Sequence, residues 1–348
     1  MKAGKLDIGS KLILAPMAEI TDSAFRKICR DYGAGLTFTQ MVSADGVIKN
    51  NFNTLRYLVF SRQEKPIGVQ VLGREPEILK NAVNELINFQ PDVIDLNGGC
   101  PASKVCKFDM GAKLLDDTFQ LGKIVTTMVK AAGNIPVSVK LRLGKNNKKI
   151  NIIENAKVCE ENGASFIIVH ARTREDKYSS QPLMHWVGEV KQKIKIPVVV
   201  NGSLFEPAEI VKVLKDTGAD SAMIARGALG NPFIFSRFNA IYETGTDPGS
   251  PSLQEIKSVC LKHTEYCTSE MDETAAINKM KKHIIWYFKE YKGIEFLMDK
   301  IFSVKTFNVL IELIDEHINN IDNEFYKNDT TEDFRRKFNE KVIFWSDN

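Results

Sequence analysis

Several features of membrane, secreted and metal-binding proteins are missing from this sequence. No stretch approaches the roughly 18 consecutive apolar residues of a membrane span, and residues 1–11 lack the apolar core of a signal peptide. The six cysteines include no CxxC pair and no zinc-like spacing with histidine, so we expect neither a disulfide framework nor a metal site. We therefore expect a cytoplasmic protein with reduced thiols and no membrane contact.

Strong net charge and internal repeats are also absent. The formal charge of +3 is too small to attract a nucleic acid by itself, so such a partner would require a local basic patch. What is present is ample apolar material, at 43% of 348 residues. This length suits one barrel of about 250 residues with an appended second domain.

A repeating pattern of apolar strand, turn and amphipathic helix extends from residue 11 to about 238. About eight such strands alternating with helices indicate a (β/α)8 TIM barrel. A doubly wound open sheet is the alternative, although it usually contains fewer strands. The expected strands are 12–15, 36–40, 67–71, 93–97, 137–141, 166–170, 197–201 and 221–225.

The remainder of the chain has a different pattern. Residues 239–250 are rich in turn formers and predict a linker. Apolar residues at helical spacing then predict a small helical bundle, so we divide the chain into domains 1–240 and 241–348. The charged tail 320–348 contains Phe334, Phe338, Phe344 and Trp345, which favours packing on the body. The expected helices are 253–266, 273–291, 294–306 and 307–319.

The stretch 92–101 is the strongest candidate for a functional loop. A buried strand ends at Asn97, two glycines permit a tight turn, and the turn displays Cys100 before Pro101. Taken alone, the thiol could equally be a small hydrophobic side chain beside a turn. Polar residues at the ends of the other strands favour a site.

In a barrel, the carboxyl ends of the strands meet at one mouth. Lys140 and Arg142 alternate on one strand and point to the same side. They predict an anionic or strongly polar ligand, although a salt bridge to a carboxylate is the alternative. His170 ends the next strand, where a lone histidine is more often a structural hydrogen-bond donor than a catalyst, although here it would face the same mouth as Lys140. The other residues at these ends are Pro16, Met17, Ala18, Gln70, Asn97, Arg172, Asn201 and Arg226.

Two glycine-containing turns follow the last two strands. They comprise Asn201-Gly202-Ser203 and Ala225-Arg226-Gly227. This is where barrels commonly bind phosphate through backbone N–H groups, and Arg226 adds a fixed charge. The pair of turns favours a phosphorylated cofactor over two ordinary turns.

In combination, these motifs resemble the tRNA-dihydrouridine synthase family over nearly the whole chain. The resemblance rests on residues 15–18 (APMA), 97–101 (NGGCP), 139–144 (VKLRLG), 170–174 (HARTR), 201–202 (NG), 226–232 (RGALGNP) and 281–287 (KKHIIWY). It implies that the enzyme binds FMN at the barrel mouth and that NADPH or NADH reduces it. The cofactor-binding residues implied are Pro16, Met17, Ala18, Gln70, Lys140, His170, Asn201, Gly202, Ser203, Ala225, Arg226 and Gly227.

The resemblance also implies the reaction and its substrate contacts. The carbon 5–carbon 6 double bond of uridine in tRNA would receive a hydride from the flavin and a proton from Cys100. A cysteine thiol suits this role because its ordinary pKa of about 8.5 keeps it protonated at pH 7. The substrate-binding residues implied are Asn97, Arg142, Arg172, Lys104, Lys281, Lys282 and His283. We expect residues 241–348 to bind tRNA and the protein to be a monomer.

Two other functions are compatible with the same residues. One is a barrel enzyme for small molecules, either a flavoprotein acting on free pyrimidines or an aldolase that uses Lys140 as a Schiff base. The other is a non-catalytic tRNA-binding protein. The basic segment at 279–289 could also be an ordinary solvated helix face.

Overall fold

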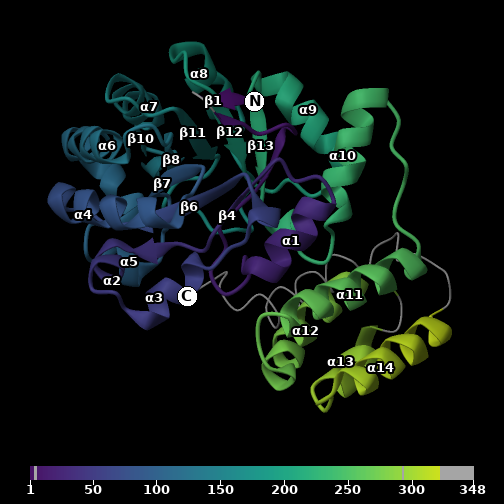
Figure 1. Cartoon of the computed structure of the whole chain (residues 1–348). Coiled ribbons are helices and arrows are strands. Elements are labelled where there is room, and N and C mark those ends of the chain that lie inside the picture. The colour runs from purple at the N-terminus through teal and green to yellow at the C-terminus, as the bar shows by residue number, and fades with distance from the viewer. Residues whose placement is uncertain (4–5, 292–293, 322–348) are drawn as a thin grey trace. The chain divides into compact units, whose positions relative to one another are not determined.

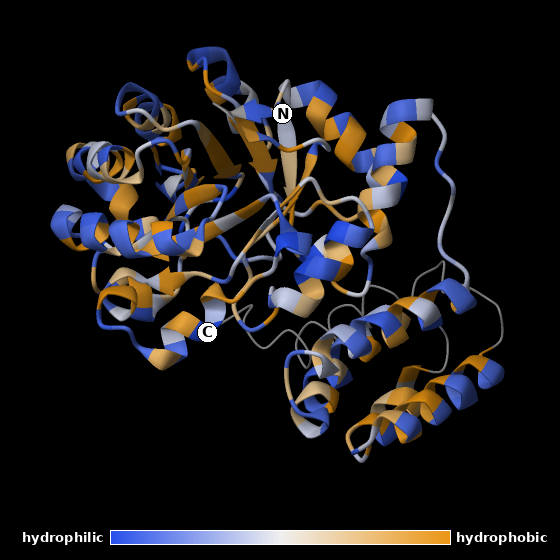
Figure 2. Cartoon of the chain, viewed as in Figure 1, coloured by the Kyte–Doolittle hydropathy of each residue, from blue (hydrophilic) through white to orange (hydrophobic). Residues whose placement is uncertain are grey.

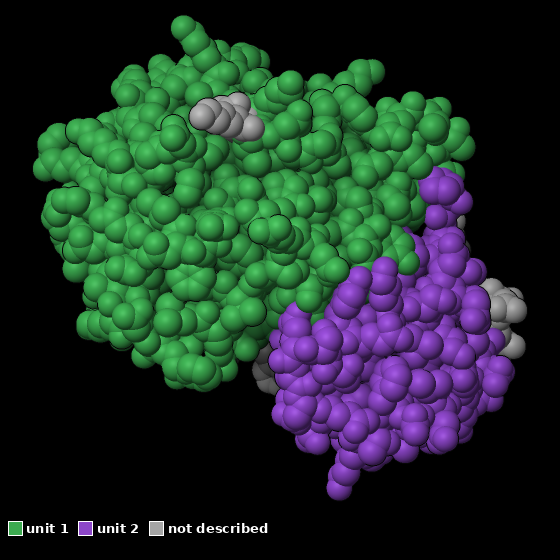
Figure 3. All heavy atoms as spheres, in the orientation of Figure 1, with its two compact units in different colours: residues 1–227, 234–247 green, residues 228–233, 248–348 purple. Residues whose placement is uncertain are grey.

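The computed structural model describes residues 1–3, 6–291 and 294–321, and the chain divides into two compact units (Figure 3). The first unit comprises Met1–Gly227 and Ile234–Asp247, and the second comprises Ala228–Phe233 and Pro248–Asn348. The boundary at 240 that the sequence indicated therefore lies inside the later part of the first unit. The aromatic residues of the tail, from 322 onward, lie outside the described residues.

The first unit is a closed parallel barrel (Figure 1). Neighbouring strands follow the order β4-β3-β13-β12-β11-β8-β7-β6, and β4 pairs with β6 to close the ring. This closure confirms the predicted (β/α)8 fold and excludes the open sheet. The strands of the ring are β3 Leu12–Leu14, β4 Leu36–Phe38, β6 Ile67–Leu72, β7 Val93–Gly98, β8 Val137–Arg142, β11 Phe166–His170, β12 Val198–Asn201 and β13 Ser221–Ile224.

These strands are mainly apolar, as expected where each is covered on both faces, inside by the barrel core and outside by helices, and their polar residues are concentrated on β7 and β8. Figure 2 shows the contrast between the hydrophobic strands and the mixed surfaces of the surrounding helices. The helices of this unit are α1 Ser23–Asp31, α2 Ala44–Ile48, α3 Phe52–Leu55, α4 Pro76–Leu86, α5 Ser103–Cys106, α6 Thr118–Ala132, α7 Ile152–Glu161, α8 His185–Lys193, α9 Pro207–Thr217 and most of α10 Phe233–Thr244.

Short elements complete the first unit. The two-residue strand β5 pairs with β6, and two small hairpins lie outside the ring. The short strands are β1 Lys2–Ala3, β2 Leu6–Asp7, β5 Val42–Ser43, β9 Gly144–Asn146 and β10 Lys149–Ile150. The 3-10 helices are η1 Arg56–Leu58, η2 Arg62–Glu64, η3 Ile87–Phe89, η4 Gly111–Asp116 and η5 Arg226–Ala228.

Helix α10 corrects the predicted linker at 239–250, because the chain stays helical through Thr244. The side chain of Asn239 bonds to Ser10 and to the carbonyl of Gly33. One turn later, the ring of Tyr242 lies 4.9 Å from the ammonium of Lys11. Contacts with the N-terminal segment thus stabilise a helical turn where the local turn formers predicted none.

The second unit contains the predicted helical bundle. Its helices are α11 Leu253–Thr268, α12 Glu273–Phe288, α13 Ile294–Ile301 and α14 Phe307–Asn320. Three of them begin at the side-chain caps Ser252, Asp272 and Thr306, each of which accepts a bond from a backbone N–H in the first turn. None of the described helices is long and apolar enough to cross a membrane.

Candidate functional site

The register of the barrel brings the predicted polar residues together at the carboxyl ends of the strands. Asn97 of β7 lies opposite Lys140 of β8, and His170 of β11 lies opposite both Arg142 of β8 and Asn201 of β12. Parallel strands that end at one edge therefore place these five residues on adjacent strands. The ring of polar residues expected from the sequence is a single cluster.

Cys100 is half-buried on the loop that follows β7, and hydrogen bonds to neighbouring segments fix the conformation of this loop. The side-chain oxygen of Asn97 accepts bonds from the backbone N–H groups of Gly99 (3.1 Å) and Cys100 (2.9 Å). Arg142 Nε donates to the carbonyl of Gly99 over 3.0 Å. The carbonyl of Cys100 accepts from the backbone N–H of Ala112 at 2.9 Å. The thiol is thus presented from a loop of defined conformation.

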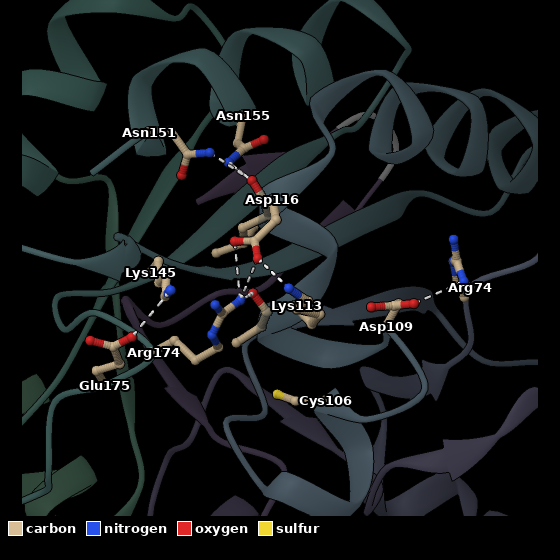
Figure 4. A network of polar contacts seen from close by, with 12 residues as sticks. Arg74, Cys106, Asp109, Lys113, Asp116, Lys145, Asn151, Asn155, Arg174 and Glu175 are labelled. Atoms are coloured by element: carbon tan, nitrogen blue, oxygen red, sulfur yellow. Dashed lines mark hydrogen bonds and ion pairs between the residues drawn. The ribbon is translucent and has the colours of Figure 1, made fainter. Parts of the chain in front are cut away.

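A polar network on the outer side of this loop holds η4 in place (Figure 4). Arg174 Nη1 donates to both carboxylate oxygens of Asp116, at 3.1 and 3.0 Å, and Lys113 binds the same carboxylate. Asn151 and Asn155 donate to the carbonyl of Leu115. The backbone N–H of Ala112 in η4 donates to the carbonyl of Cys100, so the network that holds η4 also restrains the loop of Cys100. The sequence alone did not indicate this network, because its residues come from three separate segments.

A carboxyl group that the sequence reasoning missed lies inside the barrel below this loop. Asp95 is fully buried on β7, two residues before Asn97 and on the same face. Its two oxygens accept from Ser138 Oγ (2.6 Å) and from Gln70 Nε2 (2.7 Å). Burial raises its pKa from 3.8 to about 6, although these two bonds and the charge of Lys140 oppose the shift. The available signal was one carboxylate in an otherwise apolar strand.

Burial also lowers the pKa of basic side chains at the barrel mouth. It lowers the pKa of Lys140 to about 8, and neighbouring Arg142 acts in the same direction. Lys140 Nζ donates to Asn201 Oδ1 over 3.1 Å. The pKa of His170 is well below its ordinary value, first because of burial and then because of Arg142, Lys140 and other nearby cations. His170 is therefore a neutral ring at pH 7.

Arg172 and Arg226 extend the positive cluster toward the ends of β12 and β13. Arg172 is buried and donates to Ser203 Oγ (2.8 Å) and to the carbonyls of Tyr178 and Ser180. Burial, followed by the charges of Arg226 and Arg142, lowers its pKa to about 10. The Arg226 guanidinium lies 4.8 Å from the centroid of the Tyr178 ring.

No carboxylate within the described ranges forms an ion pair with any of the four mouth cations Lys140, Arg142, Arg172 and Arg226. Neither Lys140 nor Arg142 therefore makes the direct salt bridge of the alternative interpretation, although the charges of Asp95 and Asp176 act on them from further away. A cluster of four cations, two buried and two half-buried, without a direct ion pair favours an anionic ligand.

The remaining residues expected to bind the cofactor also line the strand ends. Met17 is buried after β3, between Pro16 and Ala18, and its N–H bonds to Thr21 Oγ1. Ala225 and Gly227 flank Arg226 after β13, and Gly202 follows β12. A Cβ at Gly227 would lie 2.1 Å from the carbonyl oxygen of Leu204, so only glycine permits this approach of the chain segments that follow β12 and β13.

The structure corrects one expectation about the basic segment of α12. Lys281 and His283 are buried, with exposed fractions of 9% and 2%, and Lys281 Nζ donates to Asn278 and to the carbonyl of Phe302. The aliphatic and aromatic residues 284–288, which follow His283, are all buried. The turn that contains Lys281 and His283 is buried together with them. Lys282 and Lys104 are exposed. Of the three α12 side chains expected to contact the substrate, only Lys282 is therefore presented at the surface.

The fold and the site define a barrel enzyme with a thiol and a cluster of cations at its mouth. The sequence model of the "Dihydrouridine synthase (Dus)" family matches residues 13–328. The chain belongs to this family, which confirms the predicted class of flavin-dependent oxidoreductase.

Curated relatives agree with this assignment. The chain is 33% identical to "tRNA-dihydrouridine synthase B" of Pseudomonas aeruginosa, over 84% of this chain and 88% of that protein. It is 31% identical to "Probable tRNA-dihydrouridine synthase 1" of Synechocystis sp., over 91% and 89% of the two chains. Among solved structures, histamine dehydrogenase from Rhizobium sp. 4-9 has a TM-score of 0.55 at 13% identity. It covers 76% of this chain and 50% of its own, and this likeness supports the barrel fold alone.

Proposed function

We propose that this protein is an FMN-dependent tRNA-dihydrouridine synthase that reduces the carbon 5–carbon 6 double bond of specific uridines in tRNA, with NADPH or NADH as the reductant. Family membership and the names of the curated relatives support the substrate and the reaction. The observation that carries the proposal is a half-buried thiol beside a cluster of cations that form no direct ion pair with a carboxylate of the described residues.

The residues at the mouth fit FMN. Arg172, Arg226 and Ser203 supply fixed charge and a hydroxyl where β12 and β13 end, and they suit a phosphate. Lys140, His170 and Gln70 supply polar groups suited to the edge of a flavin ring, and Pro16, Met17 and Ala18 supply an apolar surface. The glycine turns at Gly202 and Gly227 permit close approach by a ligand. Bound flavin, once reduced by the nicotinamide, would supply the hydride.

Cys100 is the proposed proton donor. Its Sγ–H bond breaks as the proton moves to carbon 5 of the uracil, and the thiolate must then recover a proton before the next turnover. Asn97 holds the Cys100 N–H group, so the same amide fixes the donor. Arg142, already bonded to the carbonyls of Gly99 and Thr173, adds positive charge that would stabilise negative charge on the uracil oxygens.

The RNA contacts are proposed for both units. Lys104 is exposed on α5, four residues after Cys100, and Lys282 is exposed on α12. We propose that the two lysines contact phosphates and that the helical unit binds the body of the tRNA. Such contacts would make binding fall steeply with salt. The reacting uridine must leave its stack, because the thiol lies on a loop at the barrel mouth.

The test begins with the absorption spectrum of the purified full-length protein, for which we expect bound flavin. The protein should then oxidise NADPH in the presence of tRNA that lacks dihydrouridine, and should form dihydrouridine detectable by mass spectrometry. Turnover of free uracil, or borohydride trapping of a substrate on Lys140, would instead support a small-molecule enzyme.

The Cys100→Ala variant separates catalysis from simple RNA binding. We expect dihydrouridine formation to fall by a factor of about 10² or more, with the flavin spectrum and tRNA affinity unchanged, because only the proton donor is removed. Cys106→Ser is the matched control, since it replaces the neighbouring thiol at the end of α5 and retains a donor toward the Cys100 carbonyl. Full activity in Cys100→Ala would overturn the role of the thiol.

A further inference from the structure

The buried Asp95 carboxyl lies at one end of a continuous chain of hydrogen bonds. Gln70 Nε2 donates to Asp95 Oδ2, and Asn97 Nδ2 donates to Gln70 Oε1, each over 2.7 Å. Asn97 Oδ1 then accepts from the backbone N–H groups of Gly99 and Cys100. Three side chains on β6 and β7 thus connect the barrel interior to the loop that carries the thiol.

The groups at the two ends of this chain, an acceptor at Asp95 and two N–H donors in the loop, agree on one direction for its hydrogen bonds. An ionised carboxylate accepts and cannot donate, so Gln70 must turn its NH2 group toward Asp95 and its oxygen toward Asn97. Asn97 must then use its own NH2 group for Gln70, which leaves its oxygen for the two N–H groups of the loop. If either amide were reversed, an NH2 group would face the N–H groups of Gly99 and Cys100, and both bonds would be lost.

We propose that Asp95 is a positioning residue that orients the amides of Gln70 and Asn97 and thereby holds the Cys100 loop in its reactive conformation. The catalytic half of this inference rests on the proposed function of Cys100 as proton donor. The structural half does not, because the hydrogen-bond chain exists whatever substrate the enzyme uses.

The structural half is tested by hydrogen exchange of the full-length protein without substrate. The segment 98–101 contributes the amides of Gly98, Gly99 and Cys100 alone, because Pro101 has no N–H group. In Asp95→Leu we expect the Gly99 and Cys100 amides to exchange at least about tenfold faster than in the wild type, since each loses its acceptor. The amides of β12 should stay protected, which would show that the barrel is still folded.

Two further variants separate orientation from mere packing. Asp95→Asn can keep its side-chain oxygen toward Gln70 and donate to Ser138, so we expect near wild-type exchange at Gly99 and Cys100. Ser138→Ala removes the other partner of Asp95 and leaves the Gln70–Asn97 chain intact, so it should also keep these amides protected. Unchanged exchange in Asp95→Leu, or equal loss of protection in Ser138→Ala, would overturn the proposal.

Kinetics then test the catalytic half on the same three variants. We expect Asp95→Leu to lower kcat with a smaller change in the KM for tRNA, because the thiol is misplaced while the RNA contacts remain. The Asp95→Asn variant should restore most of the lost kcat. Fast exchange with unaltered kcat would refute a positioning role. Absence of dihydrouridine synthesis in the wild type would refute the proposed function and leave the exchange result standing.

Discussion

At the scale of single residues, burial shifts the pKa values of side chains at and below the barrel mouth. Lys140, His170 and Asp95 lie on adjacent parallel strands, and each has a pKa displaced toward its neutral form. Desolvation is the largest cause in all three cases. Lys140 and Asp95 therefore have pKa values within about one unit of neutral pH, whereas Arg142 stays charged. Such a combination suits a site that must bind an anion and deliver a proton.

Asp95 makes the free energy of unfolding depend on pH between its ordinary pKa of 3.8 and its folded value of about 6. The folded state binds more protons than the unfolded state in this window, so stability falls as pH rises through it. We expect a loss on the order of 3 kcal/mol from this group. Asparagine does not ionise, so Asp95→Asn should remove the loss.

Urea unfolding of both proteins measures this effect, because all other titrating groups cancel in the comparison. The stability of Asp95→Asn relative to the wild type should be greater near pH 7 than near pH 4, by about the amount lost. An equal difference at the two pH values would show that the carboxyl titrates normally in the folded protein.

Elements of secondary structure were largely predictable, because their signals are local. All eight strands of the ring were predicted with errors of one or two residues, since a buried parallel strand is a short apolar run between turn formers. The helical end of α10 and the burial of Lys281 and His283 were not predicted. The end of α10 and the burial of these two α12 side chains depend on tertiary contacts with distant parts of the chain. The local spacing of apolar residues does not contain that information. The run 284–288 was the one local sign of a buried helix end.

The site was predictable to a similar degree. The strand-end residues are visible because barrel topology collects them, as at Asn97, Lys140 and His170. Asp95 and the η4 network were missed because their roles depend on partners distant in the sequence, such as Ser138 and Arg174. The role of a single carboxylate in a strand can be inferred only when the residues of the neighbouring strands that contact it are known.

The contact between α1 and η2 supports a prediction about stability. Glu64 is fully buried, and its carboxylate accepts from Arg26 Nε at 2.7 Å and from Ser23 Oγ at 2.9 Å. We expect Glu64→Ala to lower the free energy of unfolding by about 3–5 kcal/mol, because the Arg26 charge stays buried without its partner. Urea unfolding measures the change.

The exposed pair of Lys80 and Glu77 on α4 provides the control. Glu77→Ala removes a carboxylate from an ion pair of similar length, 3.1 Å, and should cost less than about 1 kcal/mol. Similar costs for both variants would mean that burial does not determine the contribution of the Glu64 carboxylate.

At the scale of the whole molecule, two separate segments of the chain form the second unit. The short segment Ala228–Phe233 belongs with the helical bundle, although it follows directly on the phosphate-side turn at Arg226. Gly230 in this segment has φ +67°, and the carbonyl of Leu229 accepts from Lys289 Nζ at 2.8 Å. Residues that directly follow Arg226 and Gly227 in the sequence are thus part of the second unit.

Gly230 should be essential for this packing. A Cβ at this position would lie 2.0 Å from the carbonyl oxygen of Trp286 in α12, a contact with backbone that no side-chain rotation relieves. We expect Gly230→Ala to destabilise the second unit by roughly 2–5 kcal/mol, from left-handed strain and overpacking together. Gly218→Ala is the control, because Gly218 has the same φ of +67° in the left-handed region and a Cβ there would meet only the side-chain Cγ of Lys191 at 3.9 Å, so it should cost only about 1–2 kcal/mol. Hydrogen exchange of α12 measures the effect, with the amides of β7 as an internal reference. Loss of protection in α12 alone would confirm that Gly230 holds the segment against the bundle, and equal behaviour of the two variants would contradict it.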